Sequence, residues 1–322
     1  MSQRLLEVKN LRTSFFTDRG VAPAVNDVSF FINSGEIVGL VGESGSGKTV
    51  TSLSILRLIS SPGRIVGGEV LFQGSDLLSM PEKSMQAIRG NKISMIFQEP
   101  MTSHNPLMTI GNQVAEPLIL HQKLKKKEAL RRAVDLLTAV SIPDPEQRIN
   151  EYPHQLSGGM RQRVMIAMAI ACRPLLLIAD EPTTALDVTI QAQILELLLK
   201  LRDEFQLSIL LITHALGVVA EIADRVAVMY AGKIVEQAPV NQIFHHPAHP
   251  YTVGLLGSIP QITLDVKHLR LPSIEGTVPD LFHLPAGCTF YERCKDRMSV
   301  CTSSFPATTV LGNEQSVACF KY

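Results

Sequence analysis

Residues 42–49 read Gly-Glu-Ser-Gly-Ser-Gly-Lys-Thr and fit the pattern G-x-x-x-x-G-K-[ST] in full. The run EIVGLV at residues 36–41 precedes this stretch and predicts a strand that is buried on both faces. Residues 49–59 follow it with apolar side chains at helical spacing. A strand, a glycine-rich loop and a helix in this order are the context that the pattern requires, so the sequence predicts a phosphate-binding loop.

The residue types of the loop explain the chemistry. Glycines allow backbone N–H groups to converge on a phosphate, and the N-terminus of the following helix adds its positive dipole end. Lys48 supplies a positive charge to the β- and γ-phosphates, and the Thr49 hydroxyl can coordinate Mg²⁺. The apolar run at 175–179 ends in Asp180, which would hold Mg²⁺ through water, and Glu181 could polarise an attacking water.

The rest of the chain indicates an α/β protein. Short apolar runs at 93–97, 175–179, 208–212 and 225–229 predict buried strands, and residues 189–204 predict an amphipathic helix. The first 35 residues are β-rich, with strands expected at 5–8 and 28–32. The 30 basic and 30 acidic residues cancel, which argues against a nucleic-acid partner. Because no stretch of 18 apolar residues and no signal-peptide core occur, we expect a cytosolic protein.

Four further features select among phosphate-loop proteins. The sequence LSGGMRQ at 156–162 offers a second helix N-terminus suited to a phosphate, which would serve the nucleotide of a neighbouring subunit. Gln98 follows a buried strand, residues 185–187 follow Glu181 closely, and His214 closes the strand at 208–212.

Together these motifs resemble, in order and spacing, the ATP-binding subunits of ABC transporters. The resemblance implies a RecA-like P-loop cassette over 1–244, with an N-terminal antiparallel β region and a helical signature subdomain at about 98–163. It implies Glu181 and His214 as catalytic residues and Asp187 as the D-loop residue. The implied ATP-binding residues are Phe15 (with Phe16 as the alternative for stacking on adenine), Gly42, Ser44, Gly45, Ser46, Gly47, Lys48, Thr49, Val50 and Gln98. The implied Mg²⁺ ligands are Thr49, Gln98 and Asp180, and the signature residues that act on the opposite subunit's ATP are Ser157, Gly158, Gly159 and Gln162.

Three segments resemble the peptide/nickel importer subfamily, and most closely the D-type ATPase of dipeptide or oligopeptide permeases: 152–155, 178–189 and 249–252. That resemblance implies a heterodimer with a second, F-type ATPase on two membrane permeases fed by a substrate-binding protein. The chain would then lie peripherally on the cytoplasmic face of the bacterial inner membrane. A nickel or metallophore importer stays open as an alternative, and a soluble ABC ATPase of translation or DNA metabolism is the rival from another class.

The sequence departs from the family pattern at three positions. In the family, Asp usually follows the histidine that corresponds to His214, whereas this chain has Ala215. The change bears on how His214 is positioned. Glu99 stands where Asp is common. His104 stands where Leu is frequent, and we expect either a contact with the permease or an exposed loop histidine.

Residues 245–322 differ in composition and predict a separate, small and irregular Cys-rich extension. Cys288, Cys294, Cys301 and Cys319 follow the spacing C-x5-C-x6-C-x17-C. Four thiols in one segment of a cytosolic chain suggest ligation of zinc or an iron–sulfur cluster, and the wide spacing favours the cluster. The family resemblance implies a [4Fe–4S] cluster, with zinc, or four unligated cysteines, as alternatives. Cys172 follows an apolar helix and is expected in the core.

Overall fold

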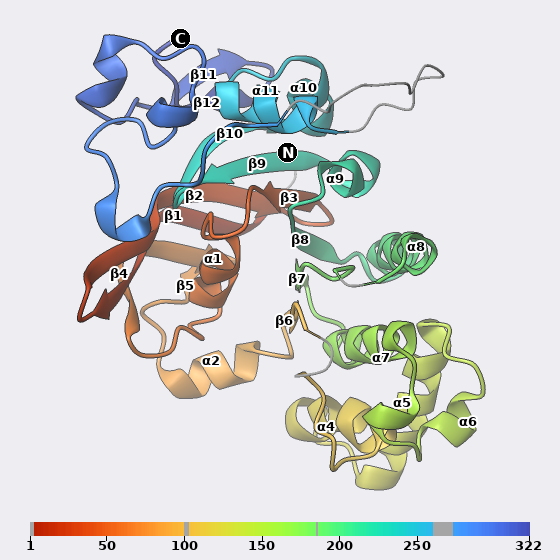
Figure 1. The fold of residues 1–322 in the computed structure, drawn as a ribbon. Helices are drawn as coiled ribbons and strands as arrows, with labels where there is room; N and C mark the ends of the chain where they lie inside the picture. The colour runs from red at the N-terminus through yellow and green to blue at the C-terminus, as the bar shows by residue number, and fades with distance from the viewer. Residues whose placement is uncertain (1–2, 100–102, 185, 260–272) are drawn as a thin grey trace, which may run out of the picture. The chain divides into compact units, whose positions relative to one another are not determined.

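The computed structural model describes residues 3–99, 103–184, 186–259 and 273–322. The chain divides into two compact units (Figure 1). The first unit is mainly Ser79–Ile212, and the second comprises Arg4–Ile32, Ile37–Leu78 and Thr213–Tyr322. In the part of the chain that the structure describes, no helix is both long enough and apolar enough to cross a bilayer.

The second unit contains an antiparallel sheet and a mixed sheet. The antiparallel sheet has the order β2-β1-β4-β5, formed by β1 (Arg4–Thr17), β2 (Gly20–Asn33), β4 (Gly63–Phe72) and β5 (Ser75–Asp76). The mixed sheet has the order β11-β12-β10-β9-β3, formed by β3 (Ile37–Val41), β9 (Arg225–Tyr230), β10 (Lys233–Pro239), β11 (Thr309–Gly312) and β12 (Gln315–Val317). Strand β3 is parallel to β9, and the other pairs are antiparallel.

The helices of the second unit are short. They are α1 (Lys48–Ile55), α9 (Leu216–Ile222), α10 (Val240–His245) and α11 (Pro250–Gly257), with 3₁₀ turns at Leu281–His283, Tyr291–Arg293 and Ser299–Thr302. Helix α1 ends four residues before the end expected from the apolar spacing. Arg57 adopts a left-handed backbone conformation, which a continuing α-helix does not allow.

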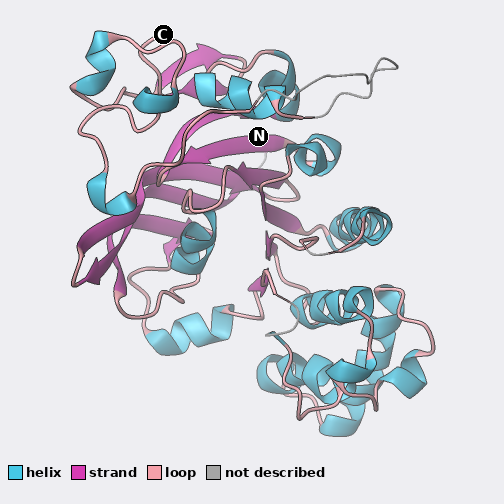
Figure 2. Ribbon diagram, viewed as in Figure 1, coloured by secondary structure: helices cyan, strands magenta, loops and turns pink. Residues whose placement is uncertain are grey.

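The first unit combines three parallel strands with most of the α-helices found in the described residues (Figure 2). The strand order is β8-β7-β6, formed by β6 (Ile93–Ile96), β7 (Leu176–Asp180) and β8 (Ser208–Thr213). Its helices are α2 (Glu82–Ile88), α4 (Ile110–Gln122), α5 (Lys126–Ala139), α6 (Pro145–Arg148), α7 (Gly158–Ile170) and α8 (Val188–Phe205). Every residue of β7 and β8 is buried, as their continuous apolar sequences predict.

The extension is more regular than its sequence predicts. Strand β12 pairs with β10 through Glu236↔Val317 and Gln237↔Ser316, and β11 adds a further strand. The expectation of an irregular extension is therefore corrected for residues 309–317, because they continue the sheet of the second unit. The sequence signal is weak because both strands are very short. The boundary after residue 244 stays a prediction.

One buried carboxylate fixes this part of the unit. Glu236 on β10 is 1% exposed and accepts hydrogen bonds from the backbone N–H groups of Ala248 and His249, both at 2.8 Å. Its Oε1 also accepts from Nε2 of Gln315 on β12 at 2.8 Å. A buried charge needs such partners, so three segments are tied to one side chain.

We expect Glu236→Gln to destabilise local pairing of β10 and β12 by about 3 kcal/mol. The NH₂ group of the new glutamine would face N–H groups that now donate to the carboxylate, and two donors cannot bond to each other. The measurement is amide hydrogen exchange over residues 315–318, which should become faster. Glu204→Gln, at an exposed position of α8, is the control and should change stability by less than about 0.5 kcal/mol. Unchanged exchange in Glu236→Gln would contradict the role of this carboxylate.

Candidate functional site

The phosphate loop joins β3 to α1 in the second unit, as predicted (Figure 1). Gly47 is the N-cap of α1 with φ 103°, and Lys48 is the first helical residue. The side chains of Ser46 and Lys48 are buried, whereas Ser44 and Gly45 are exposed. Thr49 and Val50 are half-buried in the first turn of α1. The loop therefore presents exposed backbone at the N-terminus of a helix, which is the arrangement that binds phosphate.

Two glycines of the loop are required by close packing. A Cβ atom at Gly42 would lie 2.1 Å from the carbonyl oxygen of Met229. A Cβ atom at Gly47 would lie 2.3 Å from the carbonyl oxygen of Ala24. Both residues also have positive φ, which side-chain-bearing residues rarely adopt. The loop can keep this course only with glycine at positions 42 and 47.

The loop closes around the ammonium group of Lys48. Lys48 Nζ donates to the carbonyl oxygens of Gly42 at 2.8 Å and Glu43 at 2.9 Å. The backbone N–H of Ser46 donates to the same Glu43 carbonyl at 3.2 Å. A positive charge is thereby fixed inside a ring of backbone groups, where it can meet the phosphates of a nucleotide.

A second group of acidic and polar residues lies in the first unit at the end of β7. Asp180 is the last residue of the strand and is 1% exposed. Glu181 follows with φ 47°, a left-handed conformation that is uncommon for glutamate, and its N–H donates to the Ile212 carbonyl at 2.8 Å. Such backbone strain persists where surrounding structure enforces it and clusters at functional sites.

The side chains of Glu181 and Gln98 are brought together. Glu181 Oε2 accepts a hydrogen bond from Gln98 Nε2 at 3.1 Å and another from Thr184 Oγ1 at 2.8 Å. Gln98 follows β6, which is parallel to β7, so both residues lie at the carboxyl ends of neighbouring strands. The carboxylate that could activate water is therefore held in a defined orientation.

The signature segment begins a helix of the first unit. Ser157 is the N-cap of α7, and its hydroxyl accepts from the Met160 N–H at 3.3 Å. Gly158 and Gly159 form the first turn, and a Cβ atom at Gly159 would lie 3.0 Å from the Ile190 side chain. The Gln162 side chain is only 1% exposed, and its action on the opposite subunit's ATP stays a prediction. The N-terminus of α7 is thus exposed backbone that suits an anion.

Asp187 is the N-cap of α8 and accepts a hydrogen bond from the Ile190 N–H at 2.9 Å. Ala185, which begins the expected D-loop, lies outside the described residues. His214 follows β8 on the surface of the second unit. The next residue, Ala215, donates its N–H to Thr213 Oγ1 at 3.0 Å. The hydroxyl of Thr213 therefore orders the backbone at Ala215, which is the position of the departure from the expected Asp.

The two aromatic candidates for adenine lie at the end of β1. Phe15 pairs with Gly63 of β4 and is half-buried against it, and Phe16 is more exposed beside Arg64. Both stay predictions as adenine contacts.

His104 differs from both expectations. It is 4% exposed, and its ring Nε2 donates to the carbonyl oxygen of Arg161 on α7 at 3.0 Å. Burial lowers its pKa, so the ring is held neutral. His104 is therefore a buried support of the signature helix and not an exposed loop residue or a surface contact.

The cysteines separate into one core residue and four that share a pocket. Cys172 is buried at the end of α7 and its thiol donates to the Pro117 carbonyl, as expected for a core cysteine. A pocket of about 10 Å³ is lined by the other four: Cys288, Cys294, Cys301 and Cys319. Burial, with smaller contributions from the other three thiols, raises the pKa of Cys288 to about 11.

Within the described ranges, no three His, Cys, Asp or Glu side chains converge closely enough to hold one metal ion. A preformed tetrahedral zinc site, in which all ligands meet at a single ion, is therefore not present there. The four cysteine side chains are neighbours, because they line the same pocket.

Sequence motifs gave no indication of the residues that hold the phosphate loop from outside. Arg293 lies 250 positions from Glu43, yet its Nη1 donates to Glu43 Oε2 at 2.8 Å. Tyr251 belongs to the segment 249–252, which indicated only a subfamily, and its hydroxyl accepts the Glu43 N–H at 2.9 Å. No sequence motif marks Arg293, and its burial is evident only in the structure, where its side chain is 7% exposed.

Known protein families and relatives match this chain over most of its length. Residues 25–184 match the family model described as ABC transporter, and residues 235–301 match the model described as oligopeptide/dipeptide transporter, C-terminal region. The oligopeptide transport ATP-binding protein AppD of Bacillus subtilis is 56% identical, over 99% of this chain and 97% of that protein. The dipeptide transport ATP-binding protein DppD of the same organism is 51% identical, over 99% and 95%.

A solved structure agrees at the level of the cassette. The dimeric post-hydrolysis state of the ATP-binding cassette MJ0796, bound to ADP and Pi, has a TM-score of 0.66 and 29% sequence identity. It covers 73% of this chain and 98% of that one. On its motifs, its fold and its full-length similarity, the chain belongs to the ABC transporter ATP-binding proteins of the oligopeptide/dipeptide transporter family.

Proposed function

We propose that this chain hydrolyses ATP to drive import of dipeptides or oligopeptides through two membrane permeases. The observation that carries the proposal is the phosphate loop closed around Lys48, in a chain whose C-terminal region also matches the oligopeptide/dipeptide model. A peptide substrate rests on that match and on the names of the relatives. No observation favours the nickel importer or the soluble ATPase.

Transport itself tests the substrate class. The assembled complex in vesicles, with its binding protein, should hydrolyse ATP faster when a dipeptide or oligopeptide mixture is added. Stimulation by a nickel chelate and not by peptides would overturn the peptide assignment while leaving the ATPase assignment intact.

The side chains are given the roles that the resemblance to ABC ATPases implies. Lys48 binds the β- and γ-phosphates, and Mg²⁺ would be held by the Thr49 hydroxyl, Gln98 and the Asp180 carboxylate. Glu181 accepts a proton from the attacking water, and Gln98 fixes the orientation of that carboxylate. His214 contacts the γ-phosphate.

Two ATPase chains would form the working unit. The exposed N-terminus of α7, with Ser157 and Gly159, would bind the ATP held by the phosphate loop of a second, F-type ATPase. The pair would reach the cytoplasmic face of the inner membrane through contacts with the permeases, and the binding protein would act on the outer side.

We expect Glu181→Gln in the assembled complex to lower ATP turnover at least about 100-fold, because the amide cannot accept the proton of water. ATP binding should persist, so nucleotide is retained on the protein. Steady-state phosphate release and bound-nucleotide analysis measure both effects. Glu196→Gln, on the exposed face of α8, is the control and should keep its turnover. Full turnover in Glu181→Gln would remove Glu181 from the mechanism.

Ser157→Arg tests action across the dimer. A bulky cation at the start of α7 would block this helix end from the partner's ATP, while the phosphate loop of the same chain is unaltered in sequence. We expect Ser157→Arg to keep ATP affinity within about twofold for the isolated chain and to lower turnover of the complex at least about tenfold. Normal turnover in the complex would contradict the assignment in trans.

For the four cysteines of the extension we propose an iron–sulfur cluster of the [4Fe–4S] type. The fit rests on four thiols that line one pocket. In such a cluster each thiolate binds a different iron, so the sulfurs need not converge on one point as they must around zinc. The small volume of the pocket means that the thiols must spread to admit the group. A cluster would link the segments of the extension that carry the four cysteines.

Metal analysis of protein prepared without oxygen tests this proposal. We expect about four irons and four sulfides per chain, with a brown visible absorption. Cys294→Ser should lose the colour and the iron, whereas Cys172→Ala, which alters a core cysteine outside the pocket, should keep both. A colourless protein, with or without one zinc per chain, would overturn the cluster.

A further inference from the structure

Glu43, the second residue of the phosphate loop, is hydrogen-bonded to the C-terminal part of the second unit. Its backbone N–H donates to the Tyr251 hydroxyl at 2.9 Å. Its carboxylate accepts two hydrogen bonds from Arg293, Nη1 to Oε2 at 2.8 Å and Nη2 to Oε1 at 3.2 Å. A two-pronged arginine–carboxylate pair fixes both distance and orientation.

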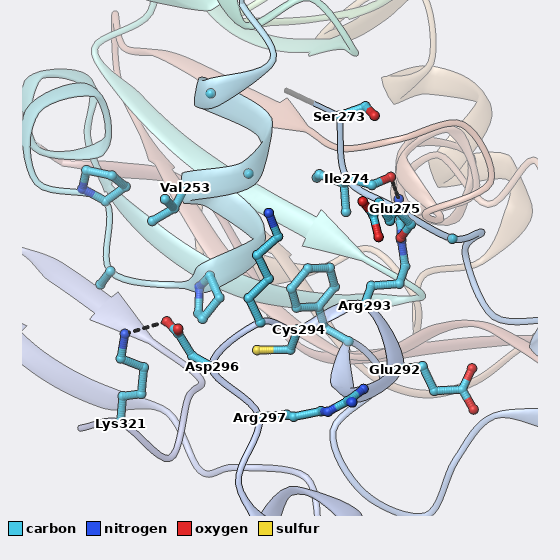
Figure 3. Close-up of a pocket in the computed structure, with 18 of the residues that line it drawn as sticks. Val253, Ser273, Ile274, Glu275, Glu292, Arg293, Cys294, Asp296, Arg297 and Lys321 are labelled. Atoms are coloured by element: carbon cyan, nitrogen blue, oxygen red, sulfur yellow. Dashed lines mark hydrogen bonds and ion pairs between the residues drawn. The ribbon is translucent and has the colours of Figure 1, made fainter. Parts of the chain in front are cut away.

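The side chain of Arg293 is buried, and each of its N–H groups donates a hydrogen bond. Its side chain is 7% exposed and forms part of the wall of a pocket of about 770 Å³ (Figure 3). Nε donates to the Glu275 carbonyl at 3.0 Å and Nη2 to the Ile274 carbonyl at 3.2 Å. Nη1 also donates to the Tyr230 hydroxyl at 3.3 Å. Since five N–H groups meet five acceptor contacts, the guanidinium has a single orientation here.

Tyr251 is fixed equally well. Its ring packs against Tyr230 and Phe290, with ring centroids 4.6 and 5.4 Å away, and Tyr230 and Phe290 are 5.2 Å apart. All three rings are buried. An aromatic group of this kind restrains the hydroxyl that accepts from Glu43.

These contacts lead to Lys48 in one further step. The N–H of Glu43 and the carbonyl of Gly42 belong to the same planar peptide unit. Tyr251 binds the N–H of that unit, and Lys48 Nζ donates to its carbonyl. Lys48 Nζ also donates to the carbonyl of Glu43 itself. A rotation of Glu43 would therefore move both backbone acceptors of the lysine.

We propose that Arg293 is a positioning residue of the phosphate loop, acting through Glu43, so that the C-terminal region takes part in binding ATP. The proposal rests on the proposed ATP binding by residues 42–49. It adds to that function a residue outside the cassette motifs, and Tyr251 supports the same peptide unit.

ATP affinity of the full-length chain, measured with a fluorescent ATP analogue, tests the proposal through a double-mutant cycle. Arg293→Ala and Glu43→Ala should each weaken binding about tenfold, and the double variant should weaken it about tenfold and not about 100-fold. Arg293→Lys keeps the positive charge but loses the paired N–H groups that bind both carboxylate oxygens, and it should recover only part of the affinity. Arg297→Ala, an exposed arginine four positions on, is the matched control and should bind normally.

Lys48→Ala tests ATP binding by the phosphate loop, and Arg293→Ala tests the positioning role, so the two can fail separately. Lys48→Ala should abolish binding, and if it does not, the phosphate loop is not the ATP site. If Lys48→Ala abolishes binding while Arg293→Ala stays within twofold of the unmodified chain, or if the effects of Arg293→Ala and Glu43→Ala multiply, the positioning role is wrong. Should Arg293→Ala fail to fold, the cycle is run with Arg293→Lys and Glu43→Gln, and Tyr251→Phe should weaken binding independently of the ion pair.

Discussion

The constraint on which the second unit depends is the close approach of the phosphate loop to its neighbouring strands. Gly42 and Gly47 leave no space for a Cβ atom against the carbonyls of Met229 and Ala24. Because the loop lies this close, its carbonyls can enclose the ammonium of Lys48. The same approach brings Glu43 within reach of Tyr251 and Arg293, far along the chain, and so makes the outer contacts of the loop possible.

Local patterns were sufficient where the chemistry is local. A fully apolar run predicts β7 and β8, because strands buried on both faces need no alternation. The phosphate loop follows from its glycines and its flanking elements. The hydrogen bond between Gln98 and Glu181 was not predicted, and the structure explains it because β6 and β7 are parallel and their carboxyl ends meet at one edge of the sheet.

What could not be predicted depends on contacts between distant residues. Strands β11 and β12 are too short for a periodic signal, and they form by pairing with β10 and by the Glu236 hydrogen bonds. His104 looks like a loop histidine in sequence, and only the tertiary fold places it under α7. A glutamate within a glycine-rich motif gives no hint of an arginine 250 residues away.

The extension and the ATP chemistry meet at two adjacent residues. Arg293 points to the phosphate loop, and Cys294, which follows it, lines the thiol pocket. Both residues also line the larger pocket of Figure 3. A side chain of the extension whose only role was to stabilise its own segment would not need to reach the second residue of the loop. Because Arg293 acts through its guanidinium and Cys294 through its sulfur, each can be altered while the other is kept, and adjacency in sequence becomes a means of separating the two roles.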